Sequence, residues 1–456
     1  MVFHDEYQTA VDQLWEMAMF AAEEEWVARS AYDLDYPEWD TYIEGISTSL
    51  ERVLRRLDFA AADGEPDAFD QMIKTFGQPT GNVFADNPRS PVRGDPTVWG
   101  HVAAAETDLN LVLANLPGTW QGDAAGAFRS LIAGAFPPTV AAQGAMICFL
   151  RGYLEAYRDV MKETRRTTIK ILNAARDAFT PQSDNIGSFA FVLIGAAAVV
   201  LGAAATGGLA VFAAGVEAGA GVLASGQQGA DRDRDESEIV IEGHLVEEII
   251  ASMDQRITEL IGHLENEEAD IETAIGLDLD TLGPGRHNIE MFQAEFNQDT
   301  DNPLDTYAGF APGDPHDVLA DCEALYQIGY VDMSSAAWHY DVAAFLLGLT
   351  TDNNEADAFG SWFTSSVGQW RSLCTAFTSR SLNHTRDKLI RYGTDLCEIA
   401  AHYAETDARN AEQVQQIFDD YVDRQAELAD ENMGNRPTMN SRAEAAAAGP
   451  ARAGAW

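Results

Sequence analysis

Long stretches of helical periodicity, interrupted by a few breaks rich in proline and glycine, constrain the fold of this chain more than any other feature. Apolar residues recur at steps of three and four, while the alternation typical of strands is rare. One stretch follows the steps 4-3-4-3-4, the seam of a coiled-coil-like helix: Val246, Ile250, Met253, Ile257, Leu260 and Leu264. The sequence therefore predicts an all-α fold, with antiparallel long-helix hairpins forming an elongated bundle.

The breaks predict eight successive segments. Two of them are linkers, because they are rich in Gly, Pro, Asp and Asn. The last segment is of low complexity, which favours disorder. In chain order the segments are an N-terminal helical pair (1–62), a linker (63–97), a helical hairpin (98–180), an apolar Gly/Ala-rich helical segment (185–228), an amphipathic coiled-coil-like helix (236–280), a second linker (281–315), a C-terminal helical hairpin (316–430) and a disordered tail (431–456).

Acidic residues dominate the charge. The chain has 73 Asp and Glu against 29 Lys and Arg, a formal net charge of −44. Binding to nucleic acid depends on clustered Lys and Arg, so we expect no nucleic-acid partner. Adaptation to high salt, or solubility alone, explains this charge as well as a binding partner does.

The motifs of the common catalytic and metal sites are absent from the sequence. Its nine histidines are scattered, and neither a His-Glu-x-x-His motif, a Gly-x-Ser-x-Gly elbow nor a phosphate-binding Gly-rich loop occurs. The four cysteines form no C-x-x-C pair and are too few for a disulfide framework. We therefore expect no enzyme, no catalytic or metal-binding residues and no cofactor.

A tryptophan separates two of the predicted helices. Pro117-Gly118 should end the first helix, and Trp120-Gln121-Gly122 leads into the second, where Gly122 permits a tight backbone. Residues 98–180 resemble the WXG family of helical-hairpin substrates of type VII secretion, although Pro137-Pro138 should kink or break the second helix. The resemblance implies that Trp120 and Gly122 shape the tip of a hairpin; the alternative is an ordinary Trp at a helix turn.

The C-terminal hairpin carries a related pattern. Phe359-Gly360-Ser361-Trp362 marks its turn, and Tyr403 and Asp407 lie one helical turn apart on a shared face. This region resembles the excreted virulence-factor-like substrates of type VII secretion, in which a Phe-Gly turn and a Tyr-x-x-x-Asp motif occur. The resemblance implies that Tyr403 and Asp407 are an export signal. The alternative is a tyrosine at the edge of the core beside a solvated aspartate.

A second Tyr-x-x-x-Asp spacing, Tyr36 and Asp40, contains Pro37 and lies in a predicted break, so we set it aside. The N-terminus begins with acidic residues and no apolar run, and we expect no cleaved general-secretion signal. Export would then depend on the type VII machinery.

Residues 185–216 carry no charge and are long enough to cross a bilayer. The strongest part runs from Phe189 to Leu201, and its eight strongly apolar residues contribute only about −2.5 to −5 kcal/mol to insertion, which is borderline. Three alternatives stay open: a buried helical hairpin, insertion under some condition, and a permanent membrane anchor.

Together these features predict a non-enzymatic protein that a type VII secretion system exports and that acts through protein–protein contacts. Its expected partners are the secretion ATPase or translocase, a helical-hairpin protein or a second copy of itself, and a membrane contacted through residues 186–224. We expect it to be secreted or at the cell surface, or alternatively associated with a membrane. The alternative functions are a membrane-inserting or pore-forming protein using residues 186–224, and an intracellular helical scaffold.

Overall fold

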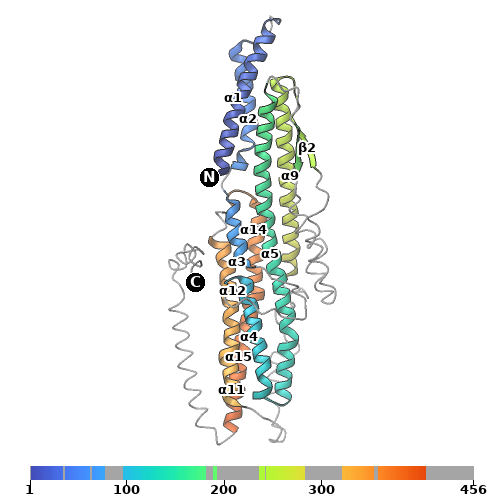
Figure 1. Ribbon diagram of the computed structural model, residues 1–456. Coiled ribbons are helices and arrows are strands. Elements are labelled where there is room, and N and C mark those ends of the chain that lie inside the picture. Colours follow the sequence, from blue (N-terminus) through green and yellow to red (C-terminus); the bar gives the residue numbers. More distant parts are fainter. Residues whose placement is uncertain are drawn as a thin grey trace. The chain divides into compact units, whose positions relative to one another are not determined.

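The structure is a computed structural model, and it describes residues 2–33, 36–61, 64–77, 96–180, 188–192, 236–241, 243–282, 321–353 and 358–406 (Figure 1). Helices dominate these residues, and the predicted all-α class is confirmed. The assembly of helix hairpins into one elongated bundle stays a prediction. The helices are α1 (Val2–Ser30), α2 (Trp39–Arg55), η1 (Asp58–Ala61), α3 (Pro66–Phe76), α4 (Val98–Thr119), α5 (Asp123–Ala178), α9 (Val246–Thr281), α11 (Cys322–Gln327), η5 (Ile328–Asp332), α12 (Met333–Asn353), α14 (Thr364–Phe377), η6 (Thr378–Leu382) and α15 (Asn383–Thr406).

The chain divides into two compact units. The first unit comprises residues 1–109, 131–299 and 335–388, and the second comprises residues 110–130, 300–334 and 389–456. Each unit is described by itself below.

A short β-ladder departs from the predicted helices. Strand β1 (Ser188–Val192) pairs antiparallel with β2 (Glu236–Val240), with Ser188 opposite Val240 and Val192 opposite Glu236. We expected helix at both places. A short apolar run cannot be assigned to helix or strand by its period alone, and the Phe and Val residues of β1 favour strand. The other residues of the 185–228 segment lie outside the part of the chain that the structure describes.

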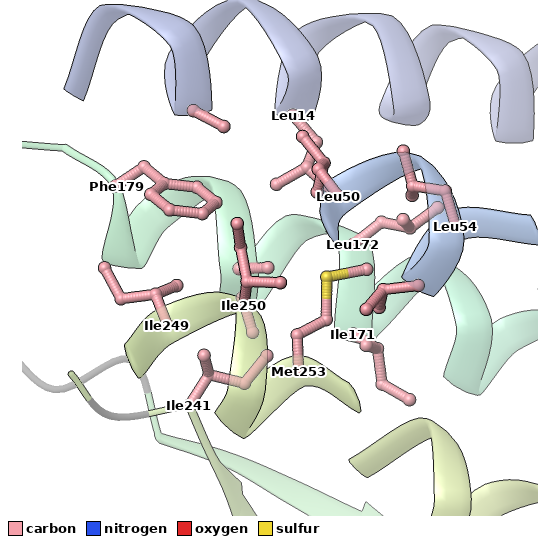
Figure 2. Packing of buried hydrophobic residues seen from close by; sticks show 14 of the residues in the cluster. Leu14, Leu50, Leu54, Ile171, Leu172, Phe179, Ile241, Ile249, Ile250 and Met253 are labelled. Carbon is pink, nitrogen blue, oxygen red and sulfur yellow. The ribbon is translucent and has the colours of Figure 1, made fainter. Parts of the chain in front are cut away.

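One apolar core of the first unit joins α1, α2, α5 and α9 (Figure 2). Leu14 of α1, Leu50 of α2, Leu172 of α5 and Met253 of α9 are all fully buried in it. The predicted seam of α9 faces this core: Val246, Ile250, Met253, Ile257 and Leu260 are buried, and Leu264 is half-buried. The helical period of the sequence therefore identified the buried face of α9, although the helix begins at Val246 and not at residue 236.

Of two helix breaks expected at prolines, the one at Pro117-Gly118 occurs one residue later, after Thr119, and the one at Pro137-Pro138 is absent. Helix α5 continues through Pro137 and Pro138, and α4 continues two residues beyond Pro117. A proline inside a helix removes one backbone hydrogen bond and adds a steric clash. At the pair in α5 the flanking side chains of Phe136 and Val140 are buried, so packing offsets this cost. The sequence predicted a kink or a break at Pro137-Pro138; the break does not occur, and the kink stays a prediction.

Candidate functional site: the tryptophan connections and helix α15

The first connection joins α4 to α5 through three residues, Trp120, Gln121 and Gly122. The side chain of Trp120 is fully buried in the second unit. Its ring centroid lies 6.1 Å from that of Phe128 in α5, and the Phe128 ring meets Tyr392 of α15 edge-on at 6.5 Å. Trp120 thus packs on α5, and Phe128 in turn links α5 to α15.

The backbone of this connection explains its glycine. Gly122 has φ = 119°, a conformation that residues with a Cβ rarely adopt. Its carbonyl accepts a hydrogen bond of 3.0 Å from Gly126 N, which starts α5. On the other side, Trp120 N donates to Leu116 O at 2.8 Å and so closes α4. The carbonyl of Thr119 accepts from Asp321 N, just before α11, at 2.7 Å.

The indole nitrogen of Trp120 has no hydrogen-bond partner among the residues the structure describes. A buried polar group without a partner costs about 1–3 kcal/mol. The contribution of Trp120 to the fold is therefore its apolar ring. The ring of Trp120 is buried, whereas Gly122 is exposed. A partner that binds the folded protein would therefore contact the glycine and not the indole.

The second connection precedes α14 and contains two residues in the left-handed conformation. Gly360 has φ = 54°, and Phe363, the residue that caps α14, has φ = 55° and ψ = 39°. For a residue with a side chain this conformation costs about 1–2 kcal/mol. Between them, Trp362 N donates to Phe359 O at 2.9 Å and closes the turn. The turn thus stores strain at Phe363 that the surrounding packing must offset.

That packing is a cluster of aromatic rings in the first unit. Phe359 lies 4.8 Å from Phe69 of α3, 5.1 Å from Tyr157 of α5 and 5.9 Å from Trp370 of α14, centroid to centroid. Aromatic pairs at such distances contribute about 0.5–1.5 kcal/mol each beyond their burial. The cluster therefore accounts for the tolerance of the strained turn.

Arg165 of α5 contacts the ring of Trp362, a second aromatic residue of this connection. The guanidinium lies 5.8 Å from the centroid of the Trp362 ring and 4.9 Å from that of Phe3. It also donates to the carbonyls of Ala60, at 3.2 Å, and Gly64, at 2.7 Å. Burial lowers the pKa of Arg165. This side chain ties α1, η1 and the start of α14 together, which is a structural role.

Of the proposed export signal, the structure describes one half. Tyr403 lies on α15 near its end and is half-buried, whereas Asp407 lies outside the described residues. The rejected pair differs from it: Tyr36 precedes α2, and the exposed Asp40 lies in the first turn of that helix. Tyr36 and Asp40 therefore do not share a helix face.

The membrane segment proposed at 186–224 lies outside the described residues except for β1. Among the described residues, Ala124–Ala178 of α5 is long and apolar enough to cross a membrane. The most apolar window of this helix has a mean hydropathy of 1.4 and is 59% buried inside the protein. The core helix of a soluble protein has the same properties, so the finding is weak support for membrane insertion.

A polar cluster that we did not predict from the sequence lies between α4 and α12 in the first unit. His101 Nδ1 lies 3.0 Å from His339 Nδ1, and His339 Nε2 lies 3.7 Å from Asp108 Oδ2. Ser335 Oγ donates to the same carboxylate oxygen at 2.7 Å. The available signal was helical spacing: 101 and 108 share a face of one helix, as do 335 and 339 of the other. In the described part of the chain, no group of three His, Cys, Asp or Glu residues could hold a metal ion.

Comparison with known proteins gave no match: no protein-family model, curated protein or solved structure is similar to this chain.

Proposed function

We propose that this chain is a non-enzymatic protein exported by type VII secretion, acting through protein–protein contacts. One observation carries the proposal. Helices α4 and α5 are joined by Trp120-Gln121-Gly122 alone, with the tryptophan ring buried and the glycine in a conformation that favours glycine. This is the local structure that a Trp-x-Gly connection between helices requires.

The proposed partner is the ATPase or translocase of the secretion system, and the proposed recognition site is Tyr403 with Asp407. Tyr403 is half-buried on α15, so part of its ring is accessible while the rest packs on the protein. In a continuing helix, the residue four positions later would lie on the same face. A tyrosine beside an acidic group offers an apolar surface and a charge to one partner.

Export is tested by comparing two pairs of variants with the same residue types and spacing. In a host with an active type VII system, we expect Tyr403→Ala and Asp407→Ala to leave the protein in the cells. The matched controls Tyr36→Ala and Asp40→Ala should reach the medium as the wild type does. The readout is the fraction of the protein in the medium and in the cell lysate.

Folding is monitored in parallel by circular dichroism of each purified variant, so that loss of export through unfolding is recognised. If the folded Tyr403→Ala and Asp407→Ala variants are exported at the wild-type level, the assignment of this signal is wrong. If the wild type itself stays in the cells beside an active secretion apparatus, the proposed function is wrong.

A further inference from the structure

The histidine pair between α4 and α12 is unusual because two imidazole nitrogens face each other without another group between them. His101 and His339 approach to 3.0 Å between their Nδ1 atoms, and their ring centroids are 5.3 Å apart. Each nitrogen lies about 1.15 Å from the centre of its own ring, so the two rings meet head-on, with little room for a bend.

This head-on geometry is that of a hydrogen bond and not of a metal chelate. A metal bound by both nitrogens at about 2.0–2.1 Å would lie off the line between them, and both lone pairs would have to turn toward it. In a hydrogen bond one Nδ1 carries the proton and the other accepts it. His101 and His339 therefore hold one shared proton along the line that joins their rings.

A carboxylate fixes which ring takes up an additional proton. Asp108 Oδ2 lies 3.7 Å from His339 Nε2 and is oriented by the hydroxyl of Ser335. Burial lowers the pKa of His339, and the negative charge of Asp108 opposes this shift in part. One extra proton can thus be accommodated, because protonated His339 faces the negative charge of Asp108 on one side and donates to His101 on the other.

A second extra proton cannot be accommodated. When both rings are protonated, both Nδ1 atoms are donors, neither can accept, and two positive charges face each other at hydrogen-bond distance. We propose that His101 and His339 are an acid-sensitive latch: the hydrogen bond between them joins this part of α4 to α12 with at most one ring protonated, and it breaks when both rings are.

The surroundings of the latch allow protons to reach it. Trp338 packs edge-on against both rings, with centroids 4.9 Å from His339 and 5.8 Å from His101, and is itself 51% exposed. The other acidic groups of the two helices near the pair are Glu106 of α4, whose pKa burial raises, and Asp341 of α12, which is paired with Arg386 of α15 at 2.9 Å. Asp108 is the acidic group that lies beside His339 Nε2, at 3.7 Å.

The first test is a titration of the histidines in the full-length protein by NMR, using ¹³C-labelled histidine. His101→Gln and His339→Gln each remove one titrating ring and assign the other, and Gln can still form a neutral hydrogen bond. We expect the second protonation of the wild-type pair to be at least about tenfold weaker than the protonation of the remaining ring in either variant. Equal titration of His339 with and without His101 would overturn the proposal.

The second test measures hydrogen exchange of residues 98–109 and 335–345 between pH 7.5 and 5, corrected for intrinsic exchange rates. The wild type should lose protection in both segments on acidification, whereas His101→Gln should not. The matched control is His263→Gln on α9. His263 lies 3.5 Å from the acidic side chain of Glu267, and none of the contacts given for it among the described residues is with a second histidine. This control should lose protection as the wild type does. If His101→Gln and the wild type lose the same protection, the latch does not exist.

Discussion

At the scale of single residues, Trp120 illustrates how a motif residue can act through its burial alone. Its ring packs against Phe128 while its indole N–H has no partner in the described part of the chain. The sequence indicated a tryptophan at a helix connection, but it could not indicate that the polar half of the side chain would be buried and unpaired. That outcome depends on tertiary packing, which the residues of this connection do not specify.

Substitutions of Trp120 by phenylalanine and by alanine distinguish the contribution of its aromatic ring to stability from that of its indole N–H group. We expect Trp120→Ala to lower the free energy of unfolding by about 3–5 kcal/mol, because a large aromatic ring leaves a cavity. Trp120→Phe removes the unpaired N–H and keeps a ring, so its effect should lie within about 1 kcal/mol of zero. Urea unfolding measures both. A loss in Trp120→Phe as large as that in Trp120→Ala would show that the indole nitrogen has a partner.

A second residue-scale prediction concerns pH. Asp278 of α9 is buried, and its carboxylate accepts a hydrogen bond of 2.7 Å from the hydroxyl of Tyr153. Burial raises the pKa of Asp278 from 3.8 to about 7, although the bond from Tyr153 opposes the shift. Between these two values the folded protein binds one more proton than the unfolded chain does. Its stability should therefore fall as pH rises from about 4 to 7.

The neutral variant Asp278→Asn lacks this proton uptake and keeps an acceptor for Tyr153. We expect the stability of the wild type relative to Asp278→Asn to be lower at pH 8 than at pH 5.5, as measured by urea unfolding at both values. An unchanged difference between the two proteins at the two pH values would contradict the raised pKa.

At the scale of helices and turns, two elements of the second unit, η5 and α15, approach each other closely through their backbones. A Cβ atom built on Gly329 would lie 2.6 Å from the carbonyl oxygen of Gly393, and one on Gly393 would lie 2.5 Å from that of Gly329. Both distances are shorter than real contacts of a Cβ allow. The two glycines are therefore required by the backbone contact between the elements, not by their own dihedral angles.

Adding a methyl group at this crossing should separate the two elements. We expect Gly329→Ala and Gly393→Ala each to lower the free energy of unfolding by about 1–3 kcal/mol. The control is Gly348→Ala in α12, where an added Cβ meets nothing within 4 Å and should stabilise the helix by about 0.5–1 kcal/mol. Thermal unfolding compares the three variants. Equal effects of all three would show that the crossing is loose.

At the scale of the whole molecule, the all-α class could be predicted because it follows from a period that repeats over many residues. The seam of α9 shows this best, since its apolar residues are the buried ones. The widened turns η5 and η6 could not be predicted, because a π-helix inserts a residue without a characteristic residue type. The ladder of β1 and β2 was missed because its partners are far apart in sequence.

The polar contacts between elements were the least predictable. Gln143 of α5 is fully buried, yet its amide donates to Ser381 and Thr385 and accepts from Tyr340. The histidine pair arises in the same way, from two helices whose register no sequence pattern specifies. Periodicity predicts which face of a helix is buried, but not which residue of the neighbouring helix lies opposite.

The ladder of β1 and β2 has a topological consequence for the uncharged stretch. Val192 and Glu236 are paired residues, so the chain leaves this ladder and returns to it at one point. A chain segment whose two ends lie side by side, on one side of a lipid bilayer, crosses that bilayer an even number of times. While the ladder is intact, its residues Val192 and Glu236 therefore lie on the same side of any membrane that the ladder itself does not cross.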